Sequence, residues 1–292
     1  MQSLLAQIKQ CFIVAELPVR LDSSKHSLND QYDAQALKRL TQIALVLLGV
    51  ALLLWLVAGY HGAFHLFNQF TPYFPAAFWQ IVTFMGDTTF VLTLALFVAR
   101  RKPELLWVLF IAAIYGTLVT HGLKTLFGTE RPPVALLVGD YNLVGKALRN
   151  GSFPSGHSFT AFAFVAVAYY FFDHRRLRLG LLLLGGLIGL SRVMVAAHWP
   201  VDVLVGGALG MLVTVAAVKT AKLSDIGFRR PMHLFIVFLL LVAALMIMSG
   251  HTGGYSQAQL FAKVIAFAAL LVFVCEYFLP ARQPRIPDAG RY

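Results

Sequence analysis

The feature that most constrains the fold is a series of apolar runs, each close to the length that crosses a bilayer. Eight runs are found, at about residues 42–59, 81–99, 105–122, 156–172, 179–197, 201–218, 234–249 and 260–279. A helix needs about 20 predominantly apolar residues to span the hydrocarbon core. The chain of 292 residues is also 59% hydrophobic and only 13% charged, which is typical of a polytopic membrane protein. The sequence therefore predicts an all-α transmembrane bundle of about eight helices.

The two ends of the chain differ from this core. Residues 1–40 are mixed, and we expect a cytoplasmic or interfacial segment with a short surface helix, since apolar residues recur every four or so positions at Leu4, Ile8, Phe12 and Ala15. A loop is predicted at Ser23–His26. Residues 41–220 are predicted to form the main transmembrane core. Residues 221–292 would add two further spans and a short basic tail. No signal peptide is expected, because the first long apolar run starts only near Gln42.

The distribution of basic residues predicts the orientation in the membrane. With a cytoplasmic N-terminus, 18 of the 24 Lys and Arg residues fall in the inside segments. Cytoplasmic loops retain such an excess of positive charge. The same topology places both termini in the cytoplasm of a cell inner membrane protein, and it places the polar segments described next on the outer, periplasmic side. The formal net charge of +11 is accordingly attributed to cytoplasmic loops that retain Lys and Arg beside anionic lipid. No nucleic-acid partner is predicted.

One polar break between two apolar runs carries candidate chemistry. It reads Ser191-Arg192-Val-Met-Val-Ala-Ala-His198-Trp-Pro200-Val-Asp202. Pro200 suits the first turn of a helix, so His198 would precede that helix and Asp202 would lie one turn inside it. The carboxylate could then accept a hydrogen bond from one imidazole nitrogen and leave the other free as a nucleophile or base. A helix start at the interface with a satisfied histidine is the alternative interpretation.

Two further segments add cations and an anion site. Six residues separate Lys124 from Arg131, and Pro132 follows Arg131 directly. Ser155-Gly156-His157 opens another apolar run, so the backbone N–H groups of these residues would lie at a helix N-terminus, which favours anions. The site predicted for phosphate comprises Lys124, Arg131, Arg192, the Ser155 hydroxyl and the N–H groups beginning at Gly156.

Together the three segments resemble, in order and spacing, the signature of the type 2 phosphatidic acid phosphatase family: K-x6-RP, PSGH and SR-x5-H-x3-D. The resemblance covers about residues 80–220, and it implies a six-helix core to which two C-terminal spans are added. It further implies that His198 attacks phosphorus to give a phosphohistidine and that Asp202 orients His198. By the same resemblance, His157 protonates the leaving oxygen and later activates water.

Other polar residues have less certain roles in the sequence. Asp87 follows Gly86 within an apolar run, so it is either a functional residue or a helix cap near the water boundary. His61 and His65 are one helical turn apart, but an interfacial role is favoured over metal binding because no third ligand is nearby. Cationic side chains would take the place of a divalent ion at the phosphate site. No metal and no cofactor are therefore predicted.

The leading hypothesis is an integral membrane phosphatase that cleaves a lipid phosphate or diphosphate at the periplasmic face. A lipid phosphotransferase would share all three motifs, with a second lipid such as lipid A as acceptor. A haloperoxidase is disfavoured by the predicted spans, and an inactive transporter or scaffold by the intact His157, His198 and Asp202. Candidate substrates are undecaprenyl diphosphate, phosphatidylglycerol phosphate, phosphatidate and lipid A, with undecaprenyl diphosphate slightly ahead.

Overall fold

A computed structural model describes residues 13–30 and 33–278 of the chain. All regular secondary structure in these residues is helical, apart from an isolated β-bridge between Glu130 and Asn150. The helices are, in chain order, α2 Ile13–Asp30, α3 Ala34–Ala58, α4 Phe64–Asn68, η1 Thr71–Tyr73, α5 Ala76–Phe84, α6 Thr88–Ala95, η2 Leu96–Val98, α7 Pro103–Phe127, α8 Pro132–Ala135, α9 Gly156–Phe171, α10 Arg175–Met194, α11 Pro200–Lys222, η3 Asp225–Phe228, α12 Arg230–Met248, η4 Ser256–Ala258 and α13 Gln259–Phe278.

The predicted all-α membrane bundle is confirmed. Six helices of the described chain are long and apolar enough to cross a membrane, namely α3, α7, α10, α11, α12 and η4 with α13. Helices α5 and α6–η2 pass the same test only when taken together, and they are bent by 62°, so they form either a broken seventh span or a re-entrant loop. The remaining predicted run forms α9, which has only 16 residues. The eight predicted runs are thus all helical, and six or seven of them have the length and composition of a full span.

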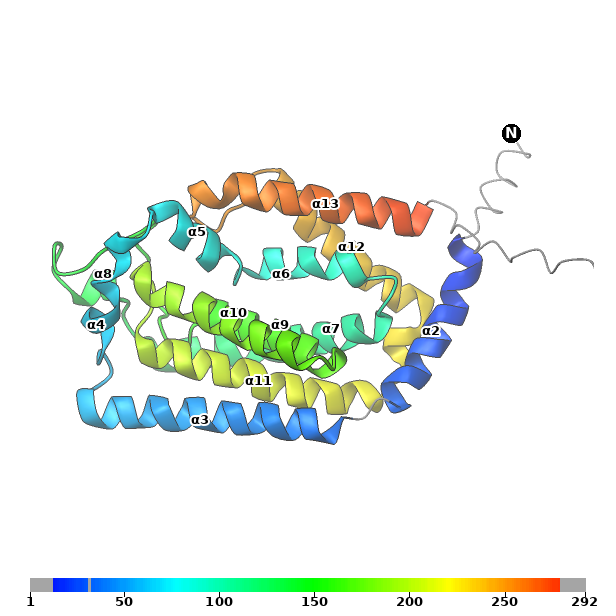
Figure 1. Ribbon diagram of the computed structural model, residues 1–292, viewed down its shortest axis with the longest axis horizontal. Helices are drawn as coiled ribbons and strands as arrows, with labels where there is room; N and C mark the ends of the chain where they lie inside the picture. Colours follow the sequence, from blue (N-terminus) through cyan, green and yellow to red (C-terminus); the bar gives the residue numbers. More distant parts are fainter. Residues whose placement is uncertain (1–12, 31–32, 279–292) are drawn as a thin grey trace, which may run out of the picture.

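Helix α11 lies at the centre of the bundle and packs against α3, α7, α9 and α10. Two glycines let it approach α9 closely. A Cβ at Gly206 would lie 2.5 Å from the Ser155 carbonyl oxygen, and one at Gly210 would lie 2.4 Å from the Phe159 carbonyl oxygen. Any side chain at either position would force the helices apart. As Figure 1 shows, α2 lies at one end of the bundle, and α4 and α8 lie at the opposite end.

The N-terminal predictions need correction. Ser23–His26 was expected to be a loop, but it lies within α2. Leu17, Leu21 and Leu28 recur at helical spacing on that helix and are buried. Their burial stabilises a helix that the local polar sequence does not suggest. The next helix, α3, begins at Ala34 rather than Gln42, because the Asp33 carboxylate accepts a hydrogen bond of 2.8 Å from the Ala36 N–H and caps it. The expected surface helix at Leu4–Phe12 lies outside the described residues.

The predicted second span is broken where the sequence turns polar. Helix α5 ends at Phe84, and α6 begins at Thr88 after Gly86 and Asp87. Asp87 has extended backbone angles, and its side chain accepts a hydrogen bond of 2.8 Å from the Thr89 N–H. Gly86 weakens the helix and Asp87 caps the next one, so the apolar run 81–99 bends at this point.

Candidate active site

The three motifs meet at one end of the bundle, although they come from different helices (Figure 1). Each predicted residue lies at or beside a helix terminus, where backbone groups lack partners within the helix. In the first motif, Lys124 is in the last turn of α7 and Arg131 directly precedes α8. In the second, Ser155 caps α9 and is followed by Gly156 and His157. In the third, Arg192 is in the last turn of α10, His198 lies between α10 and α11, and Asp202 is in the first turn of α11.

His198 and Asp202 lie side by side, and the predicted hydrogen bond between them is not formed at this separation. The Nδ1 atom of His198 lies 3.5 Å from Oδ2 of Asp202, and both side chains are buried. On the other side of the ring, Nη1 of Arg131 lies 3.2 Å from Nε2 of His198. A guanidinium can only donate, so this contact favours the tautomer with the proton on Nδ1, facing the carboxylate. Nε2 then carries the lone pair that would attack phosphorus.

The carboxylate of Asp202 is held by groups that sequence reasoning did not identify. Ser152 Oγ donates to Oδ2 at 2.6 Å, and the Trp199 N–H donates to the same oxygen at 3.0 Å. Tyr60 Oη donates to Oδ1 in a short contact. Burial and the nearby Asp202 charge raise the pKa of Tyr60, so its hydroxyl keeps the proton that it donates. Three donors therefore fix the orientation of this carboxylate.

Lys124 and Arg131 are both directed by the segment that precedes α9. Lys124 Nζ donates to the Gly151 carbonyl, and Arg131 Nη2 donates to the same oxygen at 3.2 Å. Arg131 also donates from Nε to the Asn150 carbonyl and from Nη1 to the Ala197 carbonyl, each at 2.9 Å. These acceptors are neutral, so they orient the two cations without neutralising them.

Arg192 completes a set of three cations. It is 1% exposed, and its Nη1 donates to Tyr255 Oη at 2.8 Å and to the Thr83 hydroxyl. Within the described chain, neither Arg192 nor Lys124 nor Arg131 forms an ion pair with a carboxylate. Buried cations normally require a counter-charge. Three cations share the site with one carboxylate, that of Asp202, whose charge acts on Lys124 and Arg131, so the site keeps an excess of positive charge that an anion would offset.

The electrostatics of the site favour a neutral, nucleophilic His198. Burial lowers the pKa of its imidazole well below the usual value, and the charges of Arg131, Arg192 and Lys124 lower it further. Burial and the charge of Arg192 lower the pKa of Arg131 to about 10, which leaves its guanidinium charged at neutral pH. The site thus combines fixed positive charge with an unprotonated imidazole.

The start of α9 forms the wall of a cavity of about 260 Å³ that Lys124, Gly156 and His157 line. Ser155 itself is fully buried and caps the helix: its Oγ accepts from the Ser158 N–H at 3.3 Å and from the Ser158 hydroxyl at 2.9 Å. Its backbone N–H donates to the Asp202 carbonyl at 3.0 Å, which joins two of the motifs directly. A phosphate contact through the Ser155 hydroxyl remains a prediction.

The histidines outside the motifs occupy other positions. His61 stacks on the Trp199 ring with the ring centroids 3.9 Å apart, and burial lowers its pKa. His65 packs edge-on against Phe64. Over residues 13–30 and 33–278, no three His, Cys, Asp or Glu side chains are grouped so that they could hold a metal ion.

Comparison with known proteins places this geometry in a family. Residues 104–225 match the model of the PAP2 superfamily, and that stretch contains all eight site residues predicted from the sequence. Over these residues the chain matches the PAP2 superfamily. The resemblance inferred from the three motifs is thereby confirmed. Tyr60 and Tyr255, which contact Asp202 and Arg192, lie outside the region that matches the PAP2 model.

Two PAP2 relatives and one solved structure are similar to this chain. A lipid A 1-phosphatase of Rhizobium johnstonii is 36% identical over 123 residues, which are 38% of this chain and 48% of that protein. A lipid A 1-phosphatase of Rhizobium etli is 30% identical over 155 residues, which are 45% of this chain and 65% of that protein. The chain thus spans about half to two thirds of these relatives. The crystal structure of Aquifex aeolicus LpxE matches with a TM-score of 0.49 and 29% sequence identity. The matched region covers 53% of this chain and 92% of the LpxE chain.

Proposed function

We propose that this protein is an integral membrane lipid phosphatase that works through a phosphohistidine. The observation that carries the proposal is the position of His198, backed by the Asp202 carboxylate, beside three cations, none of which forms an ion pair within the described chain. Phosphoryl transfer depends mainly on positioning and on stabilising the charge of the transferring group. Arg131 already contacts Nε2 of His198, so a phosphate that binds Arg131 is brought to the nucleophile.

Each step of the proposed reaction uses a residue at the site. His198 Nε2 forms a bond to phosphorus, the bond from phosphorus to the leaving oxygen breaks with its electron pair, and His157 gives that oxygen a proton. Asp202 stabilises the positive charge that the His198 ring acquires. In the second step His157 takes a proton from water, the water oxygen bonds to phosphorus, and the bond between phosphorus and His198 breaks.

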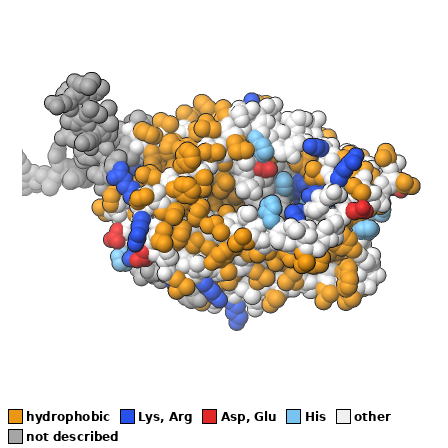
Figure 2. Space-filling view, turned by 180° about the vertical axis from the view of Figure 1, so that it is seen from behind, with side chains coloured by type: hydrophobic (Ala, Val, Ile, Leu, Met, Phe, Trp, Pro, Cys, Tyr) orange, Lys and Arg blue, Asp and Glu red, His pale blue; other side chains and the backbone are white. Residues whose placement is uncertain are grey.

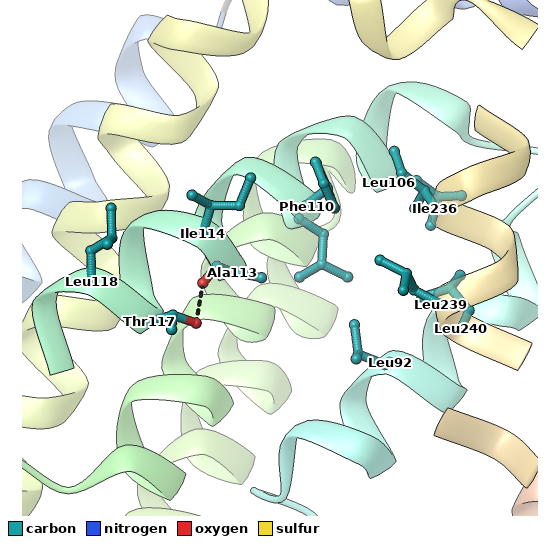
Figure 3. Close-up of a pocket in the computed structure, with 11 residues that line it drawn as sticks. Leu92, Leu106, Phe110, Ala113, Ile114, Thr117, Leu118, Ile236, Leu239 and Leu240 are labelled. Carbon is teal, nitrogen blue, oxygen red and sulfur yellow. Dashed lines mark hydrogen bonds between the residues drawn. The ribbon is translucent and has the colours of Figure 1, made fainter. Parts of the chain in front are cut away.

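Two connected cavities support a lipid as substrate. The 260 Å³ cavity beside Lys124 and His157 shares Leu92, Leu109 and Ala113 with an apolar cavity of about 330 Å³. Figure 3 shows that the second cavity lies between α6, α7 and α12, with aliphatic side chains from all three helices. On the space-filling face of Figure 2, a cluster of histidine and charged side chains lies right of centre, beside a mainly apolar surface that separates it from further charged side chains at the left end. A head group at the polar end would leave its hydrocarbon chain in the apolar cavity.

The names of the relatives favour the phosphate of lipid A as substrate, ahead of undecaprenyl diphosphate. The test is phosphate release by the purified protein from lipid A, undecaprenyl diphosphate, phosphatidylglycerol phosphate and phosphatidate. Release should be inhibited by vanadate and should survive excess chelator. Release from none of the four would contradict the proposal. Transfer of phosphate to an added acceptor lipid would instead favour the phosphotransferase, and loss with chelator that magnesium reverses would contradict a metal-free mechanism.

We further propose that the site faces the periplasm of a cell inner membrane, with both termini in the cytoplasm. The charge asymmetry of the sequence supports this orientation, since 18 of 24 Lys and Arg residues lie on the opposite side. In a background with Cys11 and Cys275 replaced by serine, Val138→Cys should react with an impermeant thiol reagent added to intact cells. Val138 is 95% exposed. Arg176→Cys, on the other side, should react only after the cells are opened. The reverse labelling would show that the orientation is wrong.

A further inference from the structure

The bend between α5 and α6 brings a second carboxylate to the site. Oδ2 of Asp87 lies 3.9 Å from Nε2 of His157, and the Asp87 side chain is only 13% exposed. A Cβ at Gly86 would lie 3.0 Å from the His157 carbonyl oxygen and 3.2 Å from its Cβ. The break therefore packs directly against the first turn of α9, which a larger residue at position 86 would prevent.

Capping accounts for only one oxygen of Asp87. Oδ1 accepts from the Thr89 N–H and lies 3.8 Å from Nε2 of His251 in the loop between α12 and α13. Oδ2 takes no part in the cap and faces His157. The Nε2 atom of His157 is buried and has no hydrogen-bond partner. Since a buried imidazole nitrogen normally has a partner, the nearby Asp87 carboxylate is the group placed to stabilise it when it is protonated.

The chemistry of the site requires such a charge. Cations that bind a phosphate also repel a protonated imidazole beside them, and Lys124 lines the same cavity as His157 and Asp87. A general acid must nevertheless carry a proton when the substrate arrives. A carboxylate about 4 Å away offsets the repulsion, and Asp202 stands in a similar relation to His198 at 3.5 Å.

We propose that Asp87 is the positioning residue and counter-ion of His157, and this inference rests on the proposed phosphatase function. Asp87 stabilises the His157 imidazolium, whose proton passes to the leaving oxygen as the bond to phosphorus breaks. The site would then hold two histidine–carboxylate pairs, one for the nucleophile and one for the acid. Asp87 lies outside residues 104–225, the region that matches the superfamily model.

The test compares Asp87→Asn on two substrates with different leaving groups. Asparagine is as good a helix cap as aspartate, so the start of α6 is retained while the charge is removed. On an alkyl phosphate such as a short-chain phosphatidate, kcat/KM, which reports the steps through formation of the phosphoenzyme, should fall by about 10- to 100-fold, a part of the 10²–10⁴-fold contribution of a general acid. On 4-nitrophenyl phosphate the fall should be under about threefold, since that leaving group departs without a proton.

Asp140→Asn is the matched control. It removes one carboxylate from an exposed position in the loop that carries Arg131, and it should change neither rate. An Asp87→Asn protein that loses activity equally on both substrates would overturn the inference, because a structural role affects both alike. Unchanged activity on both would overturn it as well. The proposed function fails separately, if the wild-type protein hydrolyses neither substrate nor any of the four lipids above.

Discussion

Replacement of His198 by alanine should abolish turnover and leave no trapped phosphoenzyme. The expected loss is on the order of 10⁴-fold or more, as for other enzymes that lose their nucleophile. Nε2 of His198 is the imidazole nitrogen that faces Arg131, while Nδ1 faces Asp202. The phosphoenzyme should be trapped from labelled substrate in a denaturing quench at alkaline pH, because the bond between phosphorus and imidazole nitrogen hydrolyses in acid.

His157→Ala provides the contrast. This variant should still form the phosphoenzyme from 4-nitrophenyl phosphate, because an activated leaving group needs no general acid. On an alkyl phosphate its rate should fall by about 10²–10⁴-fold. A phosphoenzyme that persisted in His198→Ala but vanished in His157→Ala would mean that the two histidines have the opposite roles.

Asp202→Asn should keep the fold and lower kcat by on the order of 10³–10⁴-fold, as the loss of an orienting carboxylate does in other nucleophile–histidine–aspartate sites. The amide oxygen can take the place of Oδ2 and accept from Ser152 and the Trp199 N–H. The amide nitrogen then faces Tyr60, whose hydroxyl can rotate to accept. Hydrogen bonding is satisfied, but the charge that stabilises the phosphorylated His198 ring is gone.

Tyr60→Phe is the control for this prediction. It removes one hydrogen bond to Asp202 Oδ1 but leaves the carboxylate charge in place. The expected loss in kcat is about five- to tenfold, which corresponds to one hydrogen bond of about 1 kcal/mol. Both variants should remain folded and should unfold in a single cooperative transition. If Asp202→Asn lost no more activity than Tyr60→Phe, the carboxylate charge would not be needed for the reaction.

The motif residues could be placed from the sequence because each motif is short and ends a helix. Pro200 predicts a helix start, so the spacing of four residues puts Asp202 beneath His198, and the structure has them 3.5 Å apart. That the three segments lie together could be predicted only because their order and spacing resemble the signature of a known family. The all-α bundle could also be predicted, because a helix is the structure in which an apolar run of about 20 residues can cross a bilayer with its backbone groups hydrogen-bonded.

The partners of the motif residues could not be predicted, because their contacts cross the whole fold. Tyr60 is 142 residues from Asp202, and Tyr255 is 63 residues from Arg192. Neither lies in a pattern that distinguishes it from the other tyrosines. For Asp87 the sequence left two interpretations, and the structure shows the cap directly. Its approach to His157 depends on a 62° bend that an apolar run does not reveal.

The two hydroxyl partners of Arg192 have a consequence for where the catalytic unit ends. Thr83 lies before residues 104–225 and Tyr255 lies after them. A protein reduced to the region shared with its relatives would keep Arg192 but would bury its guanidinium without either partner. A buried charged donor left in this way costs about 1–3 kcal/mol or more. The contacts of Arg192 therefore extend beyond both ends of the matched region, and the loop between α12 and α13 supplies one of them.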